Sequence, residues 1–127
     1  MATLTGAIVV ALGEEASGLF ATNDALAEQL MRAGEMTHER LWRMPLYPEY
    51  KEMLKSKIAD LKNSAGRSAG SCTAALFLQQ FIKEIPWAHL DIAGTAYLTE
   101  PKGYHPSHAT GVGVRLLIEY LDAQKKG

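Results

Sequence analysis

The sequence predicts an α/β fold, because segments with a helical period alternate with segments that have the period of a strand. The clearest unit starts with a loop of small residues over 63–71, continues with apolar residues at helical spacing, and ends in an alternating strand over Trp87 to Ala93. No internal repeat, linker or low-complexity stretch interrupts the pattern. Residues 1–127 are therefore expected to form a single domain of ordinary size.

The first half of the chain predicts short buried segments around one amphipathic helix. Ile8 to Leu12 is apolar, but it is too short for its period to separate a helix from a strand. Gly18 to Ala21 is a candidate strand, and Asn23 or Asp24 is the expected N-cap of a helix that runs to about Glu35. The rest of this half is expected to hold a connection over 42–50, a short helix over 51–55 and a strand over 58–61.

Two further helices are predicted in the second half, each with one apolar face. The first follows the loop of small residues and is expected to end at Pro86, which cannot continue a helix. The second begins near Gly111, after a long loop over 94–110. The expected apolar faces comprise Ala74, Phe77, Leu78, Phe81 and Ile82 in the first helix, and Val114, Leu117, Ile118 and Leu121 in the second.

Charge and composition argue against several classes of partner. Thirteen basic and fourteen acidic side chains leave a net charge of -1, without the basic excess of a nucleic-acid-binding protein. The apolar run from Ala7 to Leu12 is far shorter than the ~20 residues that cross a bilayer. The single cysteine, Cys72, excludes an internal disulfide framework and is consistent with a reducing compartment. We therefore expect a cytoplasmic protein with no nucleic-acid or membrane partner.

Few side chains form a recognisable catalytic pattern. His89 and Asp91 lie two residues apart on the predicted strand and share a face, which suits a catalytic dyad, although the residue types favour a satisfied polar pair. His105 and His108 lie in a loop without a third ligand at a usable spacing, so a metal site is not favoured there. Cys72 stands at a helix start, where a thiol can be reactive, but a small buried cysteine is the favoured interpretation.

Several blocks, in order along the chain, resemble those of one enzyme family. Residues 2–7, Ala-Thr-Leu-Thr-Gly-Ala, resemble the segment that follows the metal-binding motif Asn-Thr-Asp-Ala-Glu-Gly-Arg of that family. Residues 42–46, Trp-Arg-Met-Pro-Leu, match a second block, and residues 87–94, Trp-Ala-His-Leu-Asp-Ile-Ala-Gly, match the most specific one. Further matches lie at 58–63, 66–70, 73–78 and 110–111. Over essentially its whole length the chain resembles the C-terminal part of the catalytic domain of the leucyl aminopeptidases (cytosol aminopeptidases).

The resemblance implies a mixed sheet flanked by helices on its faces, as part of a metallo-aminopeptidase catalytic domain. It also implies an exopeptidase that removes N-terminal, preferably apolar, residues from peptides with two divalent metal ions, manganese or zinc. The family holds its metals with a lysine, aspartates and a glutamate, and a further lysine and an arginine assist the reaction. All of these residues belong to segments upstream of Met1. The two ligand-bearing motifs of the family, Lys-Gly-Ile/Val-Thr-Phe-Asp-Ser/Thr-Gly-Gly and Asn-Thr-Asp-Ala-Glu-Gly-Arg, are both absent from this sequence. We therefore expect no catalytic residue and no metal ligand here, and an inactive chain when it is alone.

Part of the family's substrate pocket does fall within the sequence. The resemblance assigns substrate-binding positions to Thr3, Leu4, Gly6, Ser64, Ala93 and Ala96, with backbone groups of Leu4 and Gly6 contacting the peptide. Ser64 and Ala93 to Ala96 directly follow predicted strands, which is where ligands lie in open α/β sheets. Ala96 stands where some relatives carry methionine, so a roomier pocket is expected.

The chain is therefore interpreted as a portion of a larger catalytic domain. Its opening enters apolar sequence almost at once, which suggests a preceding segment. Missing neighbours would leave sheet edges and apolar surface uncovered, so we expect self-association, as in the hexamers of full-length relatives, or dependence on a partner chain. Two alternatives stay open: a full enzyme whose other half is a separate chain, and a non-catalytic peptide-binding or subunit-assembly module that retains the fold.

Overall fold

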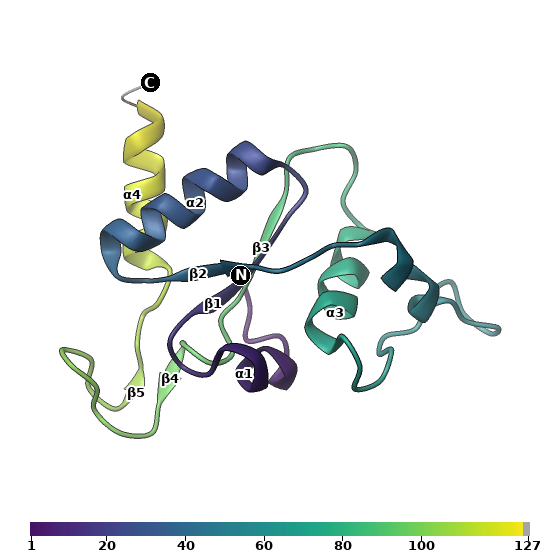
Figure 1. Cartoon of the computed structure of the whole chain (residues 1–127), viewed down its shortest axis with the longest axis horizontal. Coiled ribbons are helices and arrows are strands. Elements are labelled where there is room, and N and C mark those ends of the chain that lie inside the picture. The colour runs from purple at the N-terminus through teal and green to yellow at the C-terminus, as the bar shows by residue number, and fades with distance from the viewer. Residues whose placement is uncertain (126–127) are drawn as a thin grey trace.

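A three-stranded mixed sheet forms the centre of the molecule (Figure 1). The structure is a computed structural model and describes residues 1–125. Strand β1 (Ser17–Ala21) lies between β2 (Leu41–Arg43), which runs parallel to it, and β3 (Ala88–Asp91), which runs antiparallel. The strands expected around residues 18–21 and 87–93 are confirmed. Strand β2 corrects the expected connection over 42–50, whose first residues pair with β1 instead.

One face of the sheet is covered by α2 (Asp24–Thr37) and α4 (Val114–Lys125), which pack against each other. The predicted N-cap of α2 is confirmed at Asn23, whose side chain accepts a hydrogen bond of 2.9 Å from the backbone N–H of Leu26. The core of this face comprises Leu19, Ala21, Leu41 and Leu90 from the sheet, Ala27, Leu30 and Ala33 from α2, and Leu116 from α4.

The opposite face carries α1 (Gly6–Leu12), the 3₁₀-helix η1 (Pro48–Leu54) and α3 (Gly70–Gln79). Phe20 points to this side and packs with Cys72 and Ala75 of α3. The absence of a side chain at Gly18 allows α1 to pack closely on β1, because a Cβ on Gly18 would lie 2.5 Å from the Cδ1 atom of Ile8. Helices thus cover both faces, and the predicted mixed sheet flanked by helices is confirmed.

A buried carboxylate joins the end of α2 to the start of α4. Glu39 follows α2 and is only 6% exposed. Its side chain accepts hydrogen bonds from the backbone N–H groups of Gly113 (3.0 Å) and Leu116 (2.9 Å), and from Nε of Arg115 (3.2 Å). These donors include N–H groups that have no partner within a helix, so Glu39 caps α4 and also complements its dipole.

The structure corrects three further expectations. Residues 58–61 form no strand but an irregular exposed segment. Helix α3 ends at Gln79, well before Pro86, so Phe81 and Ile82 lie beyond it. The loop over 94–110 contains a small hairpin of β4 (Tyr97–Leu98) and β5 (His108–Ala109).

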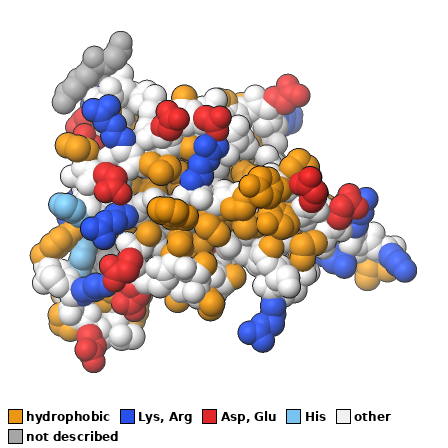
Figure 2. Space-filling model, viewed as in Figure 1, with side chains coloured by type: hydrophobic (Ala, Val, Ile, Leu, Met, Phe, Trp, Pro, Cys, Tyr) orange, Lys and Arg blue, Asp and Glu red, His pale blue; other side chains and the backbone are white. Residues whose placement is uncertain are grey.

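The expected apolar faces of the two later helices do not pack into the core. Helix α3 instead buries the side that carries Cys72, Ala75 and Leu76, and α4 buries Leu116. Figure 2 shows hydrophobic side chains gathered across the middle of one face of the molecule. The exposed large apolar residues include Phe81 and Ile85 after α3, and Val114, Leu117, Ile118 and Leu121 on α4. Within residues 1–125, no helix is both long enough and apolar enough to cross a bilayer.

Candidate functional site

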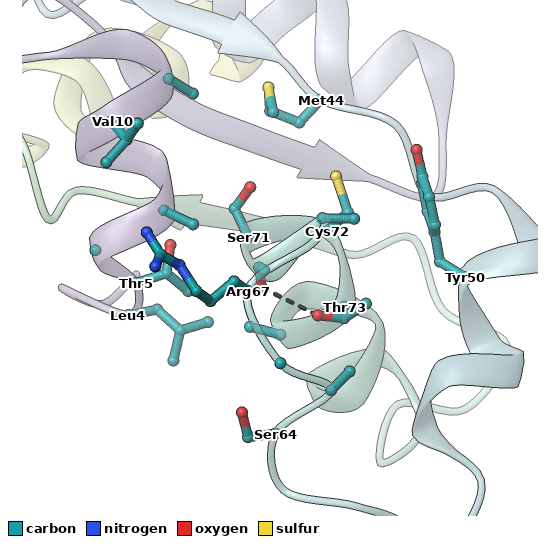
Figure 3. A pocket seen from close by; sticks show the side chains of 18 of the residues that line it. Leu4, Thr5, Val10, Met44, Tyr50, Ser64, Arg67, Ser71, Cys72 and Thr73 are labelled. Atoms are coloured by element: carbon teal, nitrogen blue, oxygen red, sulfur yellow. Dashed lines mark hydrogen bonds between the residues drawn. The ribbon is translucent and has the colours of Figure 1, made fainter.

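A pocket of about 980 Å³ opens between α1 and α3 (Figure 3). The first residues of the chain line one wall through Leu4, Gly6 and Val10. The loop that precedes α3 lines the other wall, and it includes Ser64 and Arg67. Three of the predicted substrate-binding residues, Leu4, Gly6 and Ser64, are therefore brought to one cavity by segments that lie about half the chain apart.

Small and apolar residues dominate this pocket. Its lining includes Ala7, Ala65 and Ala69 together with several glycines, and among the described residues that line it Arg67 carries the only charge. The Arg67 side chain reaches across toward Leu4 and Thr5 (Figure 3). A concave apolar surface with few polar groups is the usual form of a site for a small ligand.

The wall formed by the first residues is held in place by Asp91, which is fully buried at the end of β3. Its Oδ1 atom accepts hydrogen bonds from the backbone N–H groups of Leu4 (3.1 Å) and Ala93 (3.3 Å). Its Oδ2 atom accepts a hydrogen bond of 2.7 Å from the hydroxyl of Thr5. Thr5 also caps α1, since its Oγ1 atom accepts a hydrogen bond of 3.2 Å from the N–H of Ile8.

The other three predicted residues lie outside this pocket. Thr3 is exposed and follows Ala2, which forms an isolated parallel bridge with Asp91. Ala93 and Ala96 belong to the turn after β3, where the N–H of Ala96 donates to the carbonyl of Ile92 across 2.9 Å. Ala93 is nevertheless tied to Leu4, because both backbone N–H groups donate to the same oxygen of Asp91.

The donor set of the described chain does not fit a two-metal centre. No three histidine, cysteine, aspartate or glutamate side chains within residues 1–125 converge as a metal site requires. His105 and His108, the loop histidines, instead pack against Tyr104 and Tyr97 respectively.

The environments of Cys72 and His89 differ from those of reactive groups. Burial raises the pKa of the Cys72 thiol, and the opposing effect of a hydrogen bond with Ser71 is smaller. Cys72 is thus the small buried cysteine that the sequence favoured. Burial also lowers the pKa of His89, which lies between the rings of Phe20 and Trp87, and its Nε2 atom has no hydrogen-bond partner within the described structure.

The expected polar pair of His89 and Asp91 takes a different form. The carboxylate of Asp91 is satisfied by the N-terminal segment and by Ala93, which sequence reasoning did not anticipate. The sequence-based prediction also did not include Arg67, Met44 and Tyr50 among the pocket residues. The one available signal was the position of Asp91 at the end of a buried strand, because a buried carboxylate needs hydrogen-bond donors from somewhere in the fold.

Comparison with known proteins relates most of the chain to one family. Residues 1–118 match the model of the cytosol aminopeptidase family, catalytic domain. The probable cytosol aminopeptidase of Protochlamydia amoebophila is 68% identical over 122 residues, which are 95% of this chain and 24% of the relative. That of Roseiflexus castenholzii is 61% identical over 122 residues, again 95% of this chain and 25% of the relative. The chain thus spans about a quarter of the length of these curated relatives.

Solved structures support the same relationship. The bottromycin maturation enzyme BotP superposes with a TM-score of 0.95 at 43% identity, over 99% of this chain and 28% of that one. A tomato leucine aminopeptidase mutant superposes with a TM-score of 0.87 at 45% identity, over 94% of this chain and 23% of that one. On the family match, the high identity and the shared fold together, this chain belongs to the cytosol aminopeptidase family and corresponds to part of its catalytic domain.

Proposed function

We propose that this chain supplies part of the substrate pocket of a leucyl aminopeptidase that removes N-terminal, preferably apolar, residues from peptides. The observation that carries the proposal is the apolar pocket to which Leu4, Gly6 and Ser64 all contribute. Its small lining residues leave room for a leucine-sized side chain. On this proposal residues 1–127 are a single domain, the C-terminal portion of the catalytic domain, and the protein acts in the cytoplasm.

The substrate-binding positions are proposed to be Thr3, Leu4, Gly6, Ser64, Ala93 and Ala96. At Leu4 the structure limits which backbone group is available to a peptide. The N–H of Leu4 already donates to Asp91, so the carbonyl oxygen is the group left to accept a hydrogen bond from the substrate. Thr3, Ala93 and Ala96 lie outside the pocket of the described chain and are proposed to meet the substrate in the larger catalytic domain.

Two divalent metal ions, manganese or zinc, are proposed to act in the larger catalytic domain. A solved structure of BotP is a complex with manganese, and this chain resembles it at a TM-score of 0.93 and 44% identity. The proposed ligands lie in segments outside this sequence, because neither ligand-bearing motif occurs in it. The chain is therefore proposed to be inactive and to bind no metal when it is alone.

The proposed partners are a peptide substrate and the rest of the catalytic domain, or other copies of the chain. Support comes from the exposed apolar side chains of α4, where Ile118 is 56% and Leu121 is 57% exposed. The relatives are about four times as long as this chain. We propose that their additional residues pack against the exposed apolar side chains of α4. A nucleic-acid or membrane partner is not proposed.

Hydrolysis of leucine p-nitroanilide tests the function. The chain would be assayed with manganese or zinc, first alone and then with the remaining three quarters of the Protochlamydia amoebophila relative supplied as a separate polypeptide. We expect activity only with both polypeptides present. The added polypeptide without this chain is the matched control, and it should be inactive because part of its substrate pocket is missing.

Two results would change the assignment. Turnover by the chain alone would mean that it contains a complete catalytic site, and the proposed division of roles would be wrong. Saturable binding of leucyl peptides by the combined polypeptides, without cleavage under either metal, would favour a non-catalytic binding or assembly module.

A further inference from the structure

We propose that Asp91 is a positioning residue of the substrate pocket: its single buried carboxylate fixes the main chain of Leu4 and the main chain of Ala93 relative to each other. The inference rests on the proposed function, since it assigns to Asp91 the placement of two of the proposed substrate-binding residues. Asp91 itself does not line the pocket between α1 and α3.

The side-chain hydrogen bonds of Asp91 all join the segment of Leu4 and Thr5 to the turn that contains Ala93. Its Oδ1 atom accepts from the N–H groups of Leu4 at 3.1 Å, Thr5 at 3.4 Å and Ala93 at 3.3 Å. Its Oδ2 atom accepts from the Thr5 hydroxyl at 2.7 Å. The carboxylate therefore joins a segment at the start of the chain to a turn that begins almost ninety residues later.

Neighbouring backbone contacts extend the same junction. The N–H of Ala2 donates to the carbonyl of Leu90 at 3.1 Å, and the N–H of Ile92 donates to the carbonyl of Ala2 at 2.9 Å. These bonds align the N-terminal segment along β3 but stop at Ala2. Beyond Ala2, hydrogen bonds from Leu4 and Thr5 to the Asp91 carboxylate connect the N-terminal segment to β3. Thr5 in turn accepts from Ile8, which links this contact to the first turn of α1.

A carboxylate suits this place better than any neutral side chain. Every group that it meets is a donor, and hydrogen bonds to a charged acceptor are shorter and stronger than neutral ones. An asparagine in the same place has one oxygen and one NH₂ group, so it presents a donor toward either the backbone N–H groups or the Thr5 hydroxyl. If the NH₂ group faces Thr5, the Thr5 hydroxyl, which already accepts from Ile8, loses the acceptor for its own proton, and the cap of α1 is weakened. If the NH₂ group faces the backbone, the N–H of Leu4 loses its acceptor and the position of Leu4 is less well fixed.

The test compares Asp91→Asn with Glu39→Gln in the combined polypeptides of the aminopeptidase assay. Glu39 is a matched control, because it is also a buried carboxylate that accepts from backbone N–H groups, but it caps α4 and lies outside the proposed pocket. For Asp91→Asn we expect KM for leucine p-nitroanilide to rise about tenfold, as a lost hydrogen bond to a charged group implies. We also expect a reduced preference for leucine over alanine substrates. Glu39→Gln should lower thermal stability and leave KM and that preference unchanged.

A second pair of variants keeps the proposal testable if Asp91→Asn does not fold. Thr5→Val removes the hydroxyl that donates to Asp91 at nearly constant shape, whereas Thr5→Ser retains it. We expect Thr5→Val to raise KM and Thr5→Ser to restore the value of the unmodified protein. A loss of stability that is common to all variants, without a change in KM, would reduce Asp91 to a structural residue.

The outcomes separate this inference from the proposed function. If the unmodified polypeptides cleave the substrate and Asp91→Asn changes neither KM nor the side-chain preference, only the positioning role of Asp91 is overturned. Unmodified polypeptides that bind no leucyl substrate overturn the proposed function, and the role of Asp91 in substrate placement falls with it. Amide hydrogen exchange in the chain alone gives an independent readout, since Leu4 and Ala93 should lose protection in Asp91→Asn and keep it in Glu39→Gln.

Discussion

Gly94 lies so close to Gly13 that a Cβ atom on Gly94 would be 2.0 Å from the carbonyl oxygen of Gly13. The backbone after β3 thus passes directly against the residue that ends α1. No side chain fits between the two segments. This contact holds the turn with Ala93 and Ala96 against the helix whose first residue, Gly6, lines the pocket.

The Gly94→Ala substitution should therefore be strongly destabilising. The clashing atom belongs to the backbone and cannot move aside as a flexible side chain would, so we expect a loss of about 3 kcal/mol in the free energy of unfolding, the upper end of the usual cost of overpacking. Urea denaturation measures the change. Gly6→Ala is the control, because a Cβ there meets nothing within 4 Å, and it should be neutral or slightly stabilising. Similar effects of both substitutions would contradict the close approach.

Substitutions at two leucines of α4 are expected to differ strongly in their effect on stability. Leu116 is 1% exposed in the core, so Leu116→Ala should cost about 2–5 kcal/mol of stability. Leu121 is exposed, so Leu121→Lys should change stability by less than about 0.5 kcal/mol. If the exposed face of α4 drives self-association, Leu121→Lys should also lower the apparent mass in sedimentation. A large destabilisation by Leu121→Lys would show that α4 packs on another face.

His89 should make the folded chain less stable as the pH falls. Burial lowers its folded pKa, the N-terminal amino group acts in the same direction, and Asp91 opposes both. Its contribution to stability is complete above the unfolded pKa of 6.5 and is lost as the pH falls from there toward the lower folded pKa. Denaturation midpoints between pH 5 and pH 8 measure this loss, which should shrink in His89→Gln. The variant His105→Gln, in the loop between β4 and β5, should keep the full pH dependence.

Ala96 offers a test of pocket size. If Ala96 lines the site for the first side chain of the substrate, Ala96→Met should fill part of it and lower kcat/KM for leucine substrates about tenfold relative to alanine substrates. Ala123→Met, at an exposed position on α4, is the control and should leave the ratio unchanged. An unchanged ratio in Ala96→Met would place Ala96 outside the substrate site. The measurement is kcat/KM for the two anilides with the combined polypeptides.

Local signals in the sequence were sufficient for much of the fold. The alternation around β3 and the cap at Asn23 depend on neighbours only a few residues away, and both were predicted correctly. The motifs that resemble the family were equally local. They located Leu4, Gly6 and Ser64, which meet at one pocket.

Expectations that depended on distant neighbours were less successful. A helical period shows that a helix has an apolar face, but it does not show what covers that face. Leu117 and Ile118 of α4 belong to the apolar face that the period predicts, but both are exposed, whereas Leu116 is buried. The donors to Asp91 at Leu4 and Thr5 lie 86 or 87 residues away from it, a distance over which residue types and spacing carry no signal.

The capping of α4 by Glu39 has a consequence for the order in which the chain folds during synthesis. Glu39 leaves the ribosome more than seventy residues before its donors at Gly113 and Leu116. Until those residues emerge, α2 can form, but it ends in a carboxylate that must stay hydrated. The packing of α2 against the sheet is therefore completed only when almost the whole chain has been made, and α2 and α4 should afterwards open and close as one cooperative unit.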